Sequence, residues 1–281
     1  MHNKRNIQTG GLDRSRRRRL LNAVAAALAI TVLSPVASAI DRGTPLPASE
    51  GAYSVRMVDV ASMESSRCTA TKIGRRTFLT AAHCAAPLLV GQSLALGLGL
   101  HNVISIDLMS GPELETSGLR SIVSDIAVFE IADDTENIPI AHVTSQINER
   151  INETPVFVAG FATQEFLAPI KEGLLAKASA TRAPTLLLLS HPILFGGKLK
   201  SGNLRPGDSG SALLRAYRDE NGSWQPSDEI LGVVCAIPEG SVKALARASL
   251  FDLNRYHGIA VRLDRAETRA WIENHVDRRA L

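Results

Sequence analysis

Aromatic residues and cysteines are both scarce in this chain of 281 residues, since Phe, Trp and Tyr make up 4% of it and three cysteines occur. A buried core must therefore be built from Val, Ile, Leu and Ala, for which the hydrophobic fraction of 45% is sufficient. No His-Glu-x-x-His pattern occurs, and the scattered cysteines form no zinc cluster. Five histidines show no metal-ligand spacing: His101, His142, His191, His257 and His275. We therefore expect no metal site.

Nucleotide-binding and nucleic-acid-binding patterns are also missing. The triplet Gly97-Leu98-Gly99 lacks the remaining glycines of a dinucleotide loop, and no parallel βαβ pattern surrounds it. The net charge of +3 is misleading, because residues 1–39 contain seven basic residues and one acid. Without them the chain has 24 basic and 27 acidic residues, a net charge of −3. We therefore expect no nucleic-acid partner.

The first 39 residues have the order of an export signal peptide. A run of four arginines at 16–19 precedes an apolar stretch over 20–33, and the small-residue triplet Ala37-Ser38-Ala39 follows. An uncleaved anchor is the alternative, but the stretch is shorter than the ~20 residues of a membrane span, and Asn22 interrupts it. We expect cleavage after the triplet and only transient contact with the membrane. The route stays open, because Ser15-Arg16-Arg17 also permits twin-arginine export.

The rest of the chain, residues 40–281, consists of short apolar runs separated by turn-rich breaks. Many short strands at this spacing are typical of an all-β sandwich or barrel. The clearest helical pattern covers residues 265–276, and its apolar side is expected to consist of Ala266, Ala270, Trp271 and His275. The expected strands cover residues 54–60, 69–73, 78–81, 126–131, 156–159, 185–189, 211–214 and 230–236.

Three short segments contain the residue types of a nucleophilic hydrolase. They are Thr80-Ala81-Ala82-His83-Cys84, Ser124-Asp125-Ile126-Ala127 and Gly207-Asp208-Ser209-Gly210. Each segment alone has an ordinary structural explanation, because His at a strand end, Asp before a strand and a Gly-Asp-Ser-Gly turn are all common. The combination is more specific, since a serine becomes a nucleophile only beside a base, and the base needs a group that orients it.

Together the three segments resemble the motifs of the chymotrypsin-like (trypsin-like) serine peptidase family, in particular its exported bacterial members. His83 and Asp125 are 42 residues apart, and Ser209 follows after a further 84. The resemblance implies an all-β fold of two packed six-stranded antiparallel β-barrels with a C-terminal α-helix. The first barrel would span about residues 40–143 and carry the histidine and the aspartate. The second, at about 144–281, would carry the serine, with a cleft between the two barrels.

The resemblance also implies roles for individual residues. His83, Asp125 and Ser209 would form the catalytic triad of a serine endopeptidase that works through an acyl-enzyme. The backbone N–H groups of Gly207 and Ser209 would form the oxyanion hole. The partner would be a polypeptide substrate, and no cofactor is required.

Two further pairings follow from the same resemblance. A disulfide would join Cys68 and Cys84 beside the histidine, with two buried free thiols as the alternative. The carboxylate of Asp208 would bind the new amine of Ile40 after activation. Because Ile40 follows the expected signal cleavage site, signal removal would itself create that amine, although Asp41 departs from the apolar second residue that is usual in the family.

The specificity pocket departs from the commonest family pattern. The resemblance assigns it four residues: Asn203, Cys235, Ile237 and Gly258. An acidic residue in place of Asn203 would select substrates with Arg or Lys, and Asn supplies no such charge. Ile237 replaces a Gly of many relatives and would narrow the entrance, while Cys235 takes the place of a frequent Ser. We expect a preference for small or apolar residues.

Other functions on the same fold remain open at this stage. A catalytically silent binding protein could keep the fold, because fold alone does not guarantee activity. An esterase could use the same triad. An exported chain would be periplasmic or secreted, and the sequence indicates neither the natural substrate nor an oligomeric state.

Overall fold

The computed structural model describes much of the chain from residue 44 to residue 276. The described residues are 44–45, 53–59, 68–96, 99–109, 124–144, 151, 154–161, 172–180, 186–190, 204, 207–235 and 256–276. The chain divides into two compact units, Met1–Ala37 and Ser38–Leu281. The first unit lies outside the described residues, and so does the expected signal cleavage site. None of the helices in the described part is both long enough and apolar enough to cross a bilayer.

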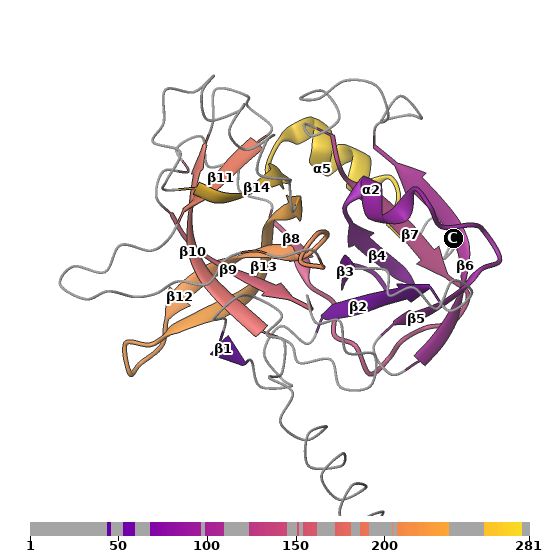
Figure 1. Ribbon diagram of the computed structural model, residues 1–281, viewed down its shortest axis with the longest axis horizontal. Helices are drawn as coiled ribbons and strands as arrows, with labels where there is room; N and C mark the ends of the chain where they lie inside the picture. Colours follow the sequence, from indigo (N-terminus) through magenta and orange to yellow (C-terminus); the bar gives the residue numbers. More distant parts are fainter. Residues whose placement is uncertain are drawn as a thin grey trace, which may run out of the picture. The chain divides into compact units, whose positions relative to one another are not determined.

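Six antiparallel strands close into a barrel in the first half of the described chain (Figure 1). The order around the barrel is β2-β3-β4-β7-β6-β5. The strands are β2 (Ser54–Asp59), β3 (Cys68–Lys72), β4 (Thr77–Thr80), β5 (Ser93–Leu96), β6 (Gly99–Leu108) and β7 (Ala127–Ile131). Closure leaves no strand with an unpaired edge, which is how all-β proteins avoid edge-to-edge aggregation.

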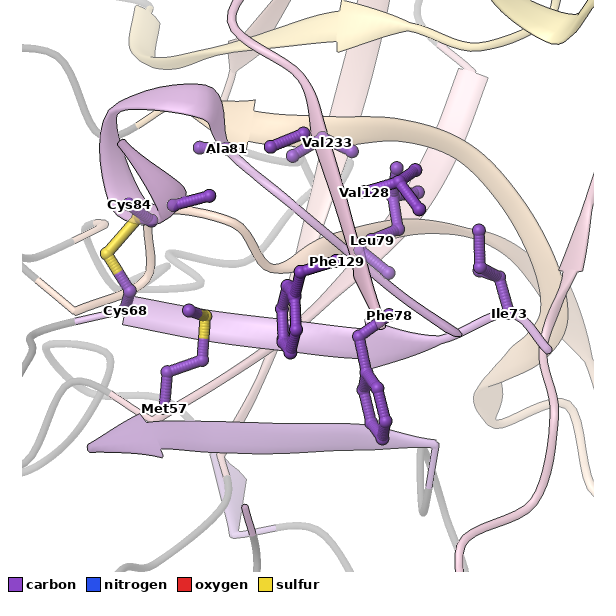
Figure 2. Packing of buried hydrophobic residues seen from close by; sticks show 14 of the residues in the cluster. Met57, Cys68, Ile73, Phe78, Leu79, Ala81, Cys84, Val128, Phe129 and Val233 are labelled. Carbon is purple, nitrogen blue, oxygen red and sulfur yellow. A yellow bond between two sulfur atoms is a disulfide. The ribbon is translucent and has the colours of Figure 1, made fainter. Parts of the chain in front are cut away.

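Two of the few aromatic residues fill the interior of this barrel. Phe78 on β4 and Phe129 on β7 are opposite each other in the strand register, and their ring centroids are 5.4 Å apart (Figure 2). Met57 and Leu79 are fully buried in the same cluster. A small number of large side chains, surrounded by aliphatic ones, is therefore sufficient for this core.

Eight strands form the second sheet, and six of them also close into a ring. Because β9 pairs with both β10 and β12, the ring runs β9-β10-β11-β14-β13-β12. The strands β1 and β8 are short additions to β10 and β13. The eight strands are β1 (Thr44–Pro45), β8 (His142–Val143), β9 (Thr154–Gly160), β10 (Glu172–Ala180), β11 (Leu186–Ser190), β12 (Ala212–Arg218), β13 (Trp224–Cys235) and β14 (Tyr256–Arg262). The expected fold of two six-stranded barrels is confirmed.

The C-terminal helix is also present, but only part of its predicted apolar side packs against the core. Helix α5 (Ala266–Glu273) buries Thr268 and Ile272, and Trp271 packs against the core with His275 half-buried beside it, while Ala266 and Ala270 are exposed. Thr268 and Ile272 are four residues apart and lie on one helix face. The periodicity was misassigned because Ala is compatible with either side of a helix, whereas the single Ile of the last turn packs into the core.

Candidate active site

The candidate base and its partner lie at neighbouring strand ends of the first barrel. His83 belongs to α2 (Ala82–Ala85), a short helix that begins two residues after β4. Asp125 lies two residues before β7, and β4 and β7 are paired, with Thr80 opposite Ala127. Strand pairing therefore brings together two residues that are distant in sequence.

Two hydrogen bonds join the histidine to the aspartate. Nδ1 of His83 lies 2.7 Å from Oδ2 of Asp125, and the backbone N–H of His83 donates to Oδ1 at 2.9 Å. The carboxylate can only accept, so Nδ1 carries a proton and Nε2 is left as the basic nitrogen. The Asp125 side chain is 9% exposed and the His83 side chain 45% exposed. The pair therefore has a buried anchor and an accessible base.

The electrostatics of Asp125 favour its ionised form. Burial raises the pKa of its carboxyl, but the hydrogen bonds and the charge of His83 lower it more, and a weaker hydrogen bond from Cys235 adds to this, so the net pKa lies below its ordinary value. Asp125 is therefore a carboxylate at neutral pH and can stabilise a positive charge on the imidazole.

The turn that contains Ser209 is bonded to both barrels. The backbone oxygen of Ser209 accepts from the N–H of Thr69 on β3 at 2.8 Å. The hydroxyl of Thr69 donates to the backbone oxygen of Gly207 at 3.0 Å. On the other side, Gly210 N–H donates to Val234 on β13 at 2.8 Å. The candidate nucleophile is thus held beside the barrel that carries His83 and Asp125.

Two glycines give this turn its shape. Gly207 has φ +112° and Gly210 has φ +83°, a region that other residues rarely adopt. A Cβ at Gly210 would lie 2.2 Å from the backbone oxygen of Thr69 and 2.2 Å from the hydroxyl of Thr80. Among the described residues, no hydrogen bond uses the N–H of Gly207 or Ser209. These are the two groups expected to form the oxyanion hole.

The remaining nitrogen of the histidine faces the disulfide. Nε2 of His83 lies 3.5 Å from Sγ of Cys84, which is bonded to Cys68, so the predicted disulfide is confirmed (Figure 2). Within the described residues, no hydrogen bond joins this nitrogen to the hydroxyl of Ser209. Such bonds are often long before substrate binds. The two sulfurs and an imidazole nitrogen also lie within 4.8 Å of one another, as the ligands of one metal ion would, but a disulfide offers no thiolate ligand.

Asp208 is fully buried and its carboxylate lies against β9. A Cβ on Gly160 would be 2.3 Å from Oδ1 of Asp208, so only glycine leaves room for the carboxylate there. Ile40, the residue expected to pair with Asp208, lies outside the described residues.

The expected specificity residues are described only in part. Cys235 ends β13 as a buried free thiol, 3.9 Å from the backbone oxygen of Asp125. Burial, and then the charge of Asp125, raise the pKa of this thiol well above its ordinary value, which makes it unreactive. Gly258 lies on β14 beside Leu204. Asn203 and Ile237 are outside the described residues.

Three contributors to the site were missed from the sequence. Thr69 holds the serine turn through its backbone and its hydroxyl, Gly160 accommodates Asp208, and Leu204 packs at Gly258. Only the position of Thr69, directly after Cys68, offered a sequence signal. The other two contacts join residues that are distant in the chain.

Two closed barrels with a His–Asp pair beside a Gly-Asp-Ser-Gly turn define the class of trypsin-like proteases. The family model described as Trypsin matches residues 40–245, so the chain belongs to the trypsin family. No curated protein sequence matches the chain significantly.

Solved structures similar to this chain include proteases and proteins named for other properties. The human heparin binding protein has a TM-score of 0.56 and 16% identity, over 84% of this chain and 96% of its own. An inactivated protease paralogue of the scabies mite has a TM-score of 0.57 and 14% identity, over 83% and 97%. The VesB protease of Vibrio cholerae has a TM-score of 0.56 and 19% identity, over 84% and 67%. At these identities the likeness shows the fold alone.

Proposed function

We propose that this protein is a serine endopeptidase that cleaves polypeptides through an acyl-enzyme. The observation that carries the proposal is the double hydrogen bond between His83 and Asp125, next to a serine turn bonded to β3. Both partners of Ser209 in a triad would then come from the first barrel. Membership of the trypsin family supports the same reaction class.

In the proposed mechanism, Nε2 of His83 takes the hydroxyl proton of Ser209 as its oxygen attacks the scissile carbonyl. The new C–O bond places a negative charge on the carbonyl oxygen, which would accept from the N–H groups of Gly207 and Ser209. The imidazolium then gives its proton to the leaving amine as the C–N bond breaks. Water repeats the sequence to release the acid and restore the serine. Asp125 holds the ring and its charge throughout.

Labelling with a fluorophosphonate tests this function directly. We expect the mature protein to be labelled at Ser209, because the reagent needs an activated serine and an oxyanion site but no particular peptide. Mass spectrometry of the labelled peptide locates the site. Ser209→Ala should abolish labelling, whereas Ser211→Ala, which removes a nearby buried hydroxyl with no hydrogen-bond partner in the described structure, should keep it.

Failure to label a folded, mature protein would instead support a catalytically silent binding protein; the scabies mite structure with this fold is also an inactivated protease paralogue. A labelled enzyme that hydrolyses ester substrates but not the matched peptides would indicate an esterase. The endopeptidase proposal requires both labelling and peptide cleavage.

Export and activation are proposed to share one cleavage, after residue 39. The amine of Ile40 would then bind Asp208 and order the oxyanion turn. The strand register supports the idea that Ile40 can reach Asp208. Thr44 pairs with Gly173 on β10, and Gly173 pairs with the β9 residue next to Gly160. Two strand spacings are ~10 Å, and the four residues back to Ile40 can span ~13 Å.

N-terminal sequencing of the active exported protein tests this activation step. We expect Ile40 as the first residue and activity without further processing. The variant Asp208→Asn should be exported and cleaved normally yet show reduced fluorophosphonate labelling, because it lacks the charge that would hold the amine. A start several residues beyond Ile40, or full activity of Asp208→Asn, would contradict shared activation and leave the endopeptidase proposal standing.

A further inference from the structure

Leu204 lies in the segment that leads to the serine turn and packs against a glycine of β14. It is half-buried and packs against a hydrophobic cluster of the second barrel that includes Val158, Leu189 and Leu231. A Cβ on Gly258 would lie 2.3 Å from a methyl carbon of Leu204, so the absence of a side chain at Gly258 leaves room for the Leu204 methyl. The three atoms nearest to that Cβ position are all carbons, from Leu204 and Leu189. The space above Gly258, where a side chain of that residue would lie, is therefore apolar and already occupied by Leu204.

Strand pairing places this space next to the reacting groups. Gly258 precedes Ile259, which is paired with Cys235 on β13. Cys235 contacts the backbone of Asp125, and its neighbour Val234 is hydrogen-bonded to Gly210 in the serine turn. Neighbouring strands are ~4.8 Å apart, so Gly258 is within about two strand spacings of the Ser209 turn. A long substrate side chain next to the attacked carbonyl would therefore extend towards Gly258, whereas a small one would stop short of it.

We infer that Leu204 is a specificity-determining residue, which restricts the substrate residue on the acyl side of the cleaved bond to small, uncharged side chains such as Ala and Val. This inference rests on the proposed endopeptidase function. A long side chain would have to displace Leu204, and an arginine or lysine would meet carbon atoms where its charge needs a partner. One methylene group in a filled apolar site changes kcat/KM by about 10- to 200-fold.

The test compares kcat/KM for matched peptides with Ala, Val, Leu, Phe or Arg before the cleaved bond. We expect the unmodified enzyme to prefer Ala and Val over Phe and Arg by at least about 10-fold. Leu204→Ala should raise the Phe-to-Ala ratio about 10- to 100-fold, because it empties the space above Gly258. Leu100→Ala removes the same side chain at a site of the first barrel that is 65% exposed, and should leave the ratio unchanged.

A second variant acts in the opposite direction. Gly258→Ala places a methyl group where the Leu204 methyl now lies. Leu204 would be pushed towards the bound substrate, so the ratio of kcat/KM for the Val peptide to that for the Ala peptide should fall. Fluorophosphonate labelling of each variant separates the two hypotheses, since it does not depend on the peptide side chain. Absence of labelling in the unmodified protein overturns the proposed function. Normal labelling with a preference for Arg, or with an unchanged Phe-to-Ala ratio in Leu204→Ala, overturns the role of Leu204.

Discussion

Asp125→Asn is expected to lower kcat about 10⁴-fold without unfolding the protein. The backbone N–H of His83 donates to Oδ1 of Asp125, so the amide oxygen of an asparagine would take that position. The amide NH₂ would then face Nδ1 of the imidazole, which has to become an acceptor. The ring proton moves to Nε2, and the ring can no longer take the proton of Ser209. Steady-state kinetics with a peptide substrate measure the effect.

Asp134→Asn is the matched control for this substitution. Asp134 also accepts a hydrogen bond from a basic side chain, that of Arg75, but it lies in the loop after β7. The Asp134 side chain is 23% exposed and makes ion pairs with Arg75 and Lys72 but not with His83, so its replacement should leave kcat within about twofold. A loss of less than 10-fold in Asp125→Asn would show that Asp125 does not set the tautomer of His83.

The variant Asp125→Asn should also change how the stability of the fold depends on pH. The pKa of Asp125 is lowered in the folded state, so its ionised form stabilises the fold at every pH above the ordinary carboxyl value of about 3.9. This contribution disappears as the pH falls through the lower, folded value. Urea unfolding should therefore show the largest difference between the two proteins near neutral pH and a smaller one near pH 3.

Gly210→Ala is expected to reduce kcat/KM by at least 10²- to 10³-fold, the usual effect of misplacing an oxyanion donor. A methyl group at Gly210 would lie 2.2 Å from the backbone oxygen of Thr69 and 2.2 Å from the hydroxyl of Thr80, and both distances are too short for a carbon–oxygen contact. The turn must move away from β3, and it takes Ser209 and its N–H with it. The positive φ of Gly210 adds a backbone cost of about 1–2 kcal/mol.

Gly222→Ala separates the backbone cost from the collision. Gly222 also has a positive φ, +78°, but the nearest atom to its missing Cβ is 3.9 Å away, on Arg218. This variant should lose a similar amount of backbone stability and keep full activity. Equal activities of the two variants, measured with peptide substrate and by fluorophosphonate labelling, would refute the role assigned to the Gly210 contact.

The sequence predicted what depends on short motifs. His83, Asp125 and Ser209 each lie in a recognisable segment, and the Cys68–Cys84 disulfide and the double barrel followed from the family pattern. Strand β10 was missed, because the segment Glu172–Ala180 has no β-branched residue, and the apolar positions that alternate along it are mostly alanines, which favour a helix. It forms a strand through pairing with both β9 and β11.

The missed parts of the site depend on contacts between distant residues. The hydrogen bond from Thr69 to Ser209 uses backbone atoms, which every residue has, so no residue type reveals it. The contact of Leu204 with Gly258 depends on the absence of one atom, and a glycine in a strand has several possible reasons. Such features require the three-dimensional arrangement.

The bond from Thr69 to Ser209 would make the proposed activity depend on the packing of the two barrels against each other. The His83–Asp125 pair belongs wholly to the first barrel and would survive a local opening of the second. The serine turn would not, because it is held by β3 on one side and β13 on the other. Proteins often open in such cooperative parts before they unfold globally. The proposed catalysis should therefore fail in milder denaturant than secondary structure does, so that a molecule whose barrels have separated would no longer cleave its substrate while most of its chain is still folded.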